Sequence, residues 1–258
     1  MPDLIIEDRD MSESADAQPK HGMVIEPESR GLYAISQGLL LEWEVVAMEG
    51  GKNFPDPTFG LAHDFPGIDE PINLDPLPSA PPLADPPQDG LILCGGQGDR
   101  RKCLNYTDSE IVEEIKILKP TTESTGWPRK PVNGGEEFTV TWNYPAKHVT
   151  RGYRWFITKE GWDDSKRITR ESFKEKNHVS DKHFTADGQD GLMWSDISDL
   201  SPFDQHRDEL QPKVITTARL PKGKRGHHVI LLVWIVAETD KAFYQAFDVD
   251  FDVPVSGK

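Results

Sequence analysis

Alternation of apolar and polar side chains dominates the second half of the chain. Within residues 136–143, for example, Phe138, Val140 and Trp142 fall on one face of an extended chain and polar residues fall on the other. Comparable strand-like runs cover residues 110–118, whose isoleucines share one parity, and residues 153–158, 228–237 and 242–253. A period of two predicts β-strands. Several such runs, separated by Gly, Pro and Asn, predict an all-β fold built as an antiparallel β-sandwich.

The rest of the chain differs in amino-acid composition. Residues 1–20 carry six Asp or Glu and lack the basic start and the apolar run of a secretory signal, so they are expected to form an acidic tail or a removable leader. Residues 21–258 are expected to form a single domain. Residues 54–90 hold ten of the 21 prolines and are expected to form a long surface loop, because proline supplies no ladder donor. Residues 194–212 are polar and irregular, with room for a short helix.

Charge and composition narrow the class of partner. The chain has 29 Lys and Arg against 44 Asp and Glu, a formal net charge of −15, so its surface repels nucleic acid and anionic lipid. No segment approaches the roughly 20 apolar residues of a membrane-spanning helix. The two cysteines, Cys94 and Cys103, either close one short loop or stay reduced, and a metal site must rely on His or carboxylate ligands.

Four groups of short motifs follow one another along the chain. They are His21-Gly22 with Pro27-x-Ser29-Arg30; Trp43-Glu44 with Glu49-Gly50 and Phe54-Pro55; Ala146-x-His148 with Tyr153-Arg-Trp-Phe-Ile-Thr-Lys159 and Trp162-Asp163; and His228 to Trp234 with Ala242-Phe-Tyr-Gln-Ala246. In content and order they resemble the motifs of the chitin-binding type-4 proteins, the bacterial-type lytic polysaccharide monooxygenases. The resemblance spans about residues 21–253. It implies an immunoglobulin or fibronectin-III-like sandwich with long loops and short helices.

The resemblance also implies a copper site. The family's N-terminal histidine binds copper through its α-amine and its ring, and a second histidine completes the set of three nitrogens. In this sequence the two histidines are His21 and His148. Nitrogen ligands of these kinds suit copper.

Further residues match positions around that site. By resemblance, Glu49 is a carboxylate that orients the oxidant, Phe243 is the aromatic residue that limits access on one axial side, and Ala146 is the small residue that packs on the other. Trp234 matches a buried aromatic residue behind the metal. Groups of this kind tune the reactivity of a metal.

The implied reaction is oxidative cleavage of a β-1,4-linked crystalline polysaccharide, with chitin as the expected substrate and cellulose as the alternative. Trp43 matches an aromatic residue that stacks on sugar, and Glu44, Glu238 and Lys241 match polar contact positions. An external electron donor is the expected partner of a monomeric protein. The resemblance implies an extracellular location, with the route of export left open by the missing signal.

The start of the chain departs from the family pattern. His21 is preceded by Lys20, so its α-nitrogen is an amide unless the chain is cut between these residues. A trypsin-like protease would cut there.

The adjacent histidines His227 and His228 are not expected to bind one metal. Neighbouring side chains on a strand point to opposite faces.

Two other functions remain compatible with the sequence. The first is a non-catalytic chitin-binding protein, such as an adhesin or a virulence factor, which would use the surface residues without copper. The second is an unprocessed cytoplasmic relative with another ligand. Copper binding at a free His21 amine distinguishes the enzyme from both.

Overall fold

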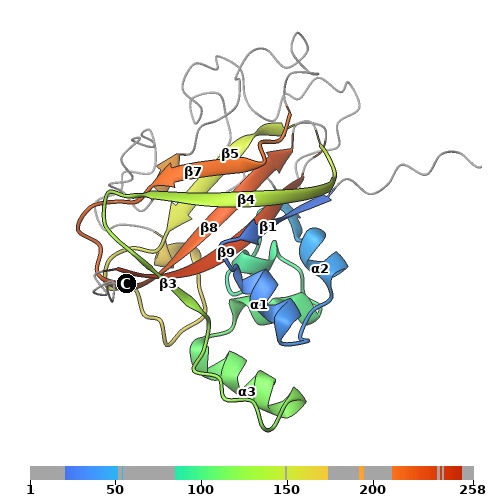
Figure 1. Cartoon of the computed structure of the whole chain (residues 1–258), viewed down its shortest axis with the longest axis vertical. Helices are drawn as coiled ribbons and strands as arrows, with labels where there is room; N and C mark the ends of the chain where they lie inside the picture. The colour runs from blue at the N-terminus through green and yellow to red at the C-terminus, as the bar shows by residue number, and fades with distance from the viewer. Residues whose placement is uncertain are drawn as a thin grey trace, which may run out of the picture.

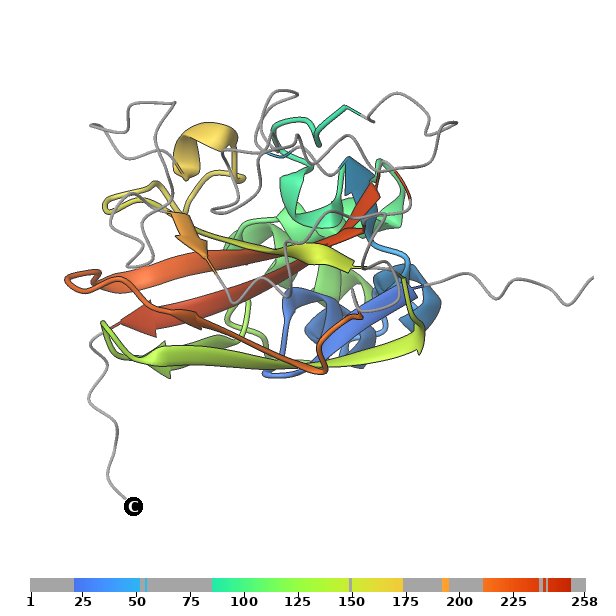
Figure 2. The ribbon, with the colours of Figure 1, turned by 90° about the horizontal axis from the view of Figure 1, so that it is seen from above.

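The computed structural model describes residues 21–51, 54, 85–148, 150–173, 192–194, 211–236, 239 and 241–251. Its strands form two sheets that lie face to face (Figure 2). In the described part of the chain, three strands in the order β1-β4-β7 make the smaller sheet, and the larger sheet has the order β2-β9-β8-β5-β6, with β3 pairing to β9. The strands are β1 (His21–Glu26), β2 (Glu49–Gly51), β3 (Arg129–Val132), β4 (Glu137–Ala146), β5 (Thr150–Ile157), β6 (Leu192–Trp194), β7 (Ile215–Arg219), β8 (Gly226–Val236) and β9 (Lys241–Phe251).

Two hydrophobic cores lie on opposite faces of the larger sheet. Along β8, Ile230, Leu232 and Trp234 face the smaller sheet, whereas Val229 and Leu231 face a layer of helices. A strand that is covered on both faces needs apolar side chains at every position, and this explains why β8 is apolar almost throughout. The predicted antiparallel β-sandwich is therefore confirmed, with a helical layer added to one side.

The helical layer consists of short segments drawn from three parts of the chain, residues 30–46, 92–118 and 170–172 (Figure 1). The α-helices are α1 (Arg30–Ser36), α2 (Glu42–Val46) and α3 (Asp108–Leu118), and the 3-10 helices are η2 (Ile92–Cys94), η3 (Arg100–Asn105) and η4 (Arg170–Ser172). No helix in the described residues is both long and apolar enough to cross a membrane.

Helix α3 corrects the strand predicted over residues 110–118. Ile111 and Ile115 are both buried, and a spacing of four fits a helix as well as a strand. Thr107 ends the ambiguity, because its hydroxyl accepts from the Glu110 amide at 3.3 Å while the Glu110 carboxylate accepts from the Thr107 amide at 2.9 Å. This reciprocal capping box is readable in the sequence and starts a helix. Ile117, which a strand would bury with the other two, is 75% exposed.

The other predicted strands are confirmed as β4, β5, β8 and β9, with ends that differ by a few residues. The predicted acidic tail at residues 1–20 lies outside the described residues. So does most of the predicted loop at residues 54–90 and of the irregular segment at 194–212.

Candidate metal centre

Strand pairing brings the two predicted metal ligands to one end of the sandwich. His21 begins β1, and its partner in the antiparallel ladder is Ala146, the last residue of β4. His148 follows Ala146 by two residues along the chain. The β1–β4 ladder therefore positions both histidines, although they are far apart in sequence.

Phe243 is the common neighbour of the two imidazole rings. Its ring centroid lies 5.7 Å from that of His21, edge to face at 89°, and 5.7 Å from that of His148, tilted at 37°. Phe243 is 1% exposed and is fixed in the middle of the larger sheet, opposite Glu49 of β2 on one side and Trp234 of β8 on the other. The structure thus brings His21, His148 and Glu49 together around the buried ring of Phe243.

Glu49 contacts the His21 ring directly. Its Oε1 atom lies 2.9 Å from His21 Nε2, with the two side chains 33% and 17% exposed. A carboxylate can only accept, so Nε2 carries the proton in this contact. Nδ1 is then the nitrogen left as a metal ligand in the neutral ring. An acceptor that fixes the ring orientation and tautomer in this way is typical of metal-binding histidines.

Trp234 supports the site from behind. Its ring stacks on Phe243 at 4.8 Å and 27°, and its centroid lies 5.9 Å from that of His148. Its Nε1 atom donates to Thr150 Oγ1 at 2.8 Å, and the same hydroxyl donates to the His148 carbonyl at 3.3 Å. Trp234 and Thr150 therefore hold the backbone at His148. No local sequence pattern marks Thr150 as part of the site.

Tyr144 is a second neighbour of the site that no sequence pattern marks. Its ring lies 4.8 Å from that of Trp234, and its hydroxyl is 2.8 Å from that of Tyr153. Burial raises the pKa of both phenols, that of Tyr153 to about 12. A Cβ atom on Gly22 would lie 2.5 Å from Tyr144 Cδ1 and 2.9 Å from Trp234 Cζ3. The glycine after His21 is thus required by space.

The predicted substrate contacts fall in different environments. Trp43 is 62% exposed on α2, as a sugar-stacking side chain requires. Lys241 begins β9 and is partly exposed, and Glu238 lies outside the described residues. The prediction for Glu44 needs correction, because this side chain is only 4% exposed and forms an ion pair with Arg100.

Glu44 is held inside the protein by two donors. Its Oε2 atom accepts from the Leu41 amide at 2.7 Å, and Oε1 accepts from Arg100 Nε. Burial is the largest single effect and raises the pKa of this carboxyl, but the bonds from Arg100 and the Leu41 amide and the charge of Arg100 together outweigh it, so the pKa lies below its usual value. Its partner Arg100 is half exposed and is the charged group that reaches solvent here.

The Pro27-x-Ser29-Arg30 motif serves the fold rather than the metal. Ser29 caps α1 by accepting from the Leu32 amide at 3.2 Å. Arg30 is buried, and its Nε and NH2 atoms donate to the two Asp248 carboxylate oxygens at 2.6 and 2.8 Å. Burial raises the pKa of Asp248, but Arg30 and then His227 outweigh it and the pKa is lowered.

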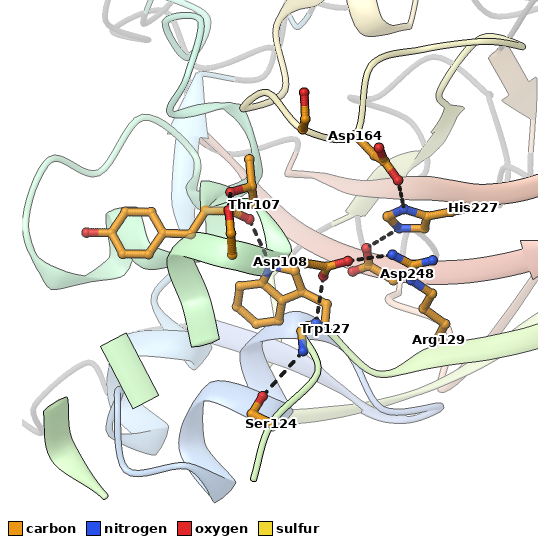
Figure 3. A network of polar contacts seen from close by, with 12 residues as sticks. Thr107, Asp108, Ser124, Trp127, Arg129, Asp164, His227 and Asp248 are labelled. Carbon is orange, nitrogen blue, oxygen red and sulfur yellow. Dashed lines mark hydrogen bonds and ion pairs between the residues drawn. The ribbon is translucent and has the colours of Figure 1, made fainter. Parts of the chain in front are cut away.

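The histidines of β8 are bound to neighbouring side chains. His227 Nε2 lies 2.7 Å from Asp248 Oδ1, and its Nδ1 lies 3.3 Å from Asp164 Oδ2 (Figure 3). His228 is buried on the other face of the strand, where its Nδ1 lies 3.0 Å from Thr158 Oγ1. Their separation onto two faces agrees with the expectation that they do not share a metal.

The donor types at the His21 end of the sandwich fit a copper ion. Among the residues that the structure describes, no three His, Cys, Asp or Glu side chains gather as a metal site. A metal held by His21 and His148 therefore needs a donor of another kind. Once the bond from Lys20 is cut, the α-nitrogen of His21 would be such a donor, beside Nδ1 of the same residue. Amine and imidazole nitrogens suit copper.

Comparison with known proteins identifies the family. A family model described as "Lytic polysaccharide mono-oxygenase, cellulose-degrading" matches residues 21–249. The crystal structure of a chitin binding domain from Burkholderia pseudomallei has a TM-score of 0.64 and 32% identity, over 90% of this chain and 100% of that one. The chain belongs to the lytic polysaccharide monooxygenase family, as its motifs predict.

Two curated relatives carry functional names. GlcNAc-binding protein A of Shewanella oneidensis is 26% identical over 241 residues, which are 90% of this chain and 35% of that protein. Lytic chitin monooxygenase of Enterococcus faecalis is 30% identical over 139 residues, 53% of this chain and 58% of that protein. The chain thus spans about a third of the first relative and little more than half of the second.

Proposed function

We propose that this protein is a copper-dependent monooxygenase that cleaves β-1,4-linked crystalline polysaccharide, with chitin as its substrate. The observation that carries the proposal is the contact of His21 and His148 with one Phe243 ring, with Glu49 bonded to the His21 ring. Membership of the lytic polysaccharide monooxygenase family supports it.

In this proposal, His21 binds copper through its α-amine and Nδ1, and His148 supplies the third nitrogen. Copper there would supply the redox chemistry by which an oxygen co-substrate, with electrons from an external donor, oxidises C1 or C4 of a sugar. Glu49 holds the His21 ring through Nε2 and stands beside the site to orient the oxidant. Phe243 limits access from one side, and Ala146 is the small residue that packs on the other.

The proposed substrate is a neutral polymer. Trp43 exposes 62% of its surface and offers a flat ring for a sugar to stack on. The net charge of −15 disfavours anionic polymers. The names of the two curated relatives refer to GlcNAc and to chitin and support chitin, whereas the description of the family model refers to cellulose, the alternative substrate. Lys241, and Glu238 with it, are the proposed polar contacts.

The proposed location and processing of the protein rest on the family and on the residues that precede His21. We place the protein outside the cell as a monomer that receives electrons from an external donor. His21 gains a free amine only if the bond from Lys20 is cut, so residues 1–20 act as a removable leader. The mass of the N-terminal peptide in protein from its natural host tests this step. Finding only chains that still contain residues 1–20 would contradict it.

Copper titration tests the metal site. A chain that starts at His21 should bind Cu(II) tightly and give the tetragonal EPR spectrum of a nitrogen-rich site, whereas the intact chain should bind more weakly, because an amide nitrogen is a poor donor. His148→Ala should remove tight binding. His183→Ala, at a histidine that belongs to none of the four motif groups, should not. Equal copper affinity of the His148→Ala variant and the parent would overturn the ligand assignment.

The substrate assignment has its own test. Trp43→Ala should weaken adsorption to crystalline chitin and leave the copper spectrum unchanged, because the indole is exposed and makes no contact with the histidine rings. Ile117→Ala, at a residue 75% exposed on α3, is the matched control and should adsorb like the parent. Stronger adsorption to cellulose than to chitin would redirect the proposal to cellulose.

The alternative function is a non-catalytic chitin-binding protein, and one observation favours it. In the intact chain the His21 nitrogen is acylated by Lys20, while Trp43 remains exposed. Incubation with chitin, copper and a reductant, followed by mass spectrometry, distinguishes the two functions. Oxidised oligosaccharides support the enzyme, and adsorption without them supports the binding protein.

A further inference from the structure

The backbone of Glu49 is held on two sides. Strand β2, which carries Glu49, lies at the edge of the larger sheet, so one row of its backbone groups faces away from the ladder. On the sheet side, the Tyr244 amide donates to the Met48 carbonyl at 3.0 Å and the Tyr244 hydroxyl donates to the Gly51 carbonyl at 2.6 Å. The carbonyls in these bonds belong to residues before and after Glu49. The backbone of Glu49 can therefore be contacted from outside the sheet.

The turn after η2 packs on the other side. A Cβ atom built on Gly95 would lie 2.6 Å from the Glu49 carbonyl oxygen, and one built on Gly50 would lie 2.6 Å from the Gly95 carbonyl oxygen. The two backbones therefore touch directly, without side chains between them. Gly95 also has a φ of 65°, a conformation that glycine adopts readily.

Gln97 extends this contact to the Glu49 carbonyl. Its Nε2 atom donates to the Glu49 carbonyl oxygen at 2.6 Å, and its Oε1 atom accepts from Arg101 NH2 at 3.0 Å. Because Arg101 can only donate, it fixes the orientation of the amide so that the nitrogen faces Glu49. The half-buried Gln97 thus has one orientation and one backbone target.

Arg101 holds the same segment at a second point. Its NH1 atom donates to the Ala47 carbonyl at 2.8 Å, and that carbonyl also accepts from the Glu49 amide at 2.9 Å. Asp99 completes the group, since its Oδ2 atom lies 2.7 Å from Arg101 NH2 and the bonds from Arg101 lower the pKa of the carboxyl. The Arg101 side chain is 13% exposed.

We propose that Gln97 and Arg101 are positioning residues of the metal centre, which hold the Glu49 backbone so that its carboxylate meets His21 Nε2. The role of that contact in catalysis rests on the proposed function, but the contact itself does not. The two residues bond to Ala47 and Glu49 and act on His21 only through Glu49. A displacement of about 1 Å at a reacting site can cost on the order of 100-fold in rate, so this kind of support matters.

The test is a set of variants studied first in the metal-free full chain. Gln97→Glu keeps the length of the side chain and an acceptor for Arg101, but it puts an oxygen against the Glu49 carbonyl. Arg101→Lys keeps the charge and loses the fork of donors. Gln88→Glu makes the same chemical change as Gln97→Glu at an exposed residue and is the control. Glu49→Gln shows what loss of the carboxylate does.

The readout is the nitrogen NMR signal of His21 Nε2, with thermal unfolding measured beside it. Gln97→Glu and Arg101→Lys should move this signal toward its position in Glu49→Gln, while Gln88→Glu leaves it at the parent position. In the Glu49→Gln background, Gln97→Glu should move the signal no further, because its effect passes through the carboxylate. A purely structural role would lower the melting temperature and leave the signal in place.

Two results would overturn the inference. One is an unchanged His21 signal in a folded Gln97→Glu variant when Glu49→Gln moves it. The other is an equal displacement by Gln97→Glu with and without the Glu49 carboxylate. Neither result depends on copper, so failure of the proposed function is recognised separately by the copper titration. In the copper-loaded protein that starts at His21, Gln97→Glu should also lower the rate of polysaccharide oxidation by roughly 10-fold.

Discussion

Ala146 is the ladder partner of His21, and this pairing places β1 beside the end of β4. Two residues after Ala146 the chain reaches His148, whose ring then meets Phe243 from a second direction. In a β-sheet, a shift of register by one residue turns every side chain of the strand to the other face. The site therefore depends on the register of one ladder at its last pair.

Substitution of Gly22 should disturb this register. The Cβ atom of a Gly22→Ala variant would lie 2.5 Å from Tyr144 Cδ1, so β1 or the aromatic cluster must move. We expect a loss of about 1–3 kcal/mol in the free energy of unfolding, the usual cost of overpacking, together with weaker copper binding.

Urea denaturation and copper titration measure the two effects. Gly98→Ala is the control, because a Cβ atom there meets nothing within 4 Å. A Gly22→Ala protein as stable as the control would show that the cluster yields at no cost.

Loss of Arg30 should destabilise the fold strongly. Asp248 is fully buried, and in Arg30→Met its carboxylate loses the guanidinium that does most to lower its pKa. Removing one partner of a buried ion pair costs about 3–5 kcal/mol. Arg30→Met combined with Asp248→Leu should recover part of this loss. The control is Lys116→Met in the exposed pair with Glu113, which should change stability by less than about 0.5 kcal/mol.

His228 should make the fold sensitive to mild acid. Burial, and then the nearby Lys224, lower its pKa in the folded protein, although Glu160 acts in the opposite sense. The unfolded chain therefore binds a proton at a pH where the folded chain does not, and stability falls as the pH drops below the ordinary value of 6.5.

The slope from this one group is at most about 1.4 kcal/mol per pH unit. Urea denaturation of the parent and of His228→Gln, at pH values from about 7.5 down to about 5, measures it. The variant should lose less stability than the parent over this range. Parallel curves for the two proteins would contradict the assignment to His228.

The two cysteines should be unreactive thiols in the folded protein. Cys94 and Cys103 are both free and buried, and burial raises the pKa of their thiols to about 11 and about 12. Since the thiolate is the reactive form, a thiol reagent at about pH 8 should modify them only slowly. Unfolding in guanidinium without a reductant should release both thiols at once. A protein that yields no thiol under these conditions would contain a disulfide.

Local sequence patterns determine many of the strands of this protein and predict its family. Strands β4, β5, β8 and β9 follow from side chains that alternate or are wholly apolar, because a pleated strand sends neighbouring side chains to opposite faces. The short motifs that carry His21, His148 and Phe243 predict the family. The spacing of the isoleucines in α3 fits both a helix and a strand, but the capping box at Thr107 indicates a helix.

Other features were decided only by tertiary structure. Glu44 and Glu49 lie five residues apart and look equivalent in sequence. In the structure, Glu44 is buried and paired with Arg100, whereas the β2–β9 ladder places Glu49 beside His21. Gln97 and Thr150 belong to no motif and gain their places through long-range packing. Local periodicity determines which residues form a strand, but the environment of a charge depends on which distant segments pack against it, and only the folded chain brings those segments together.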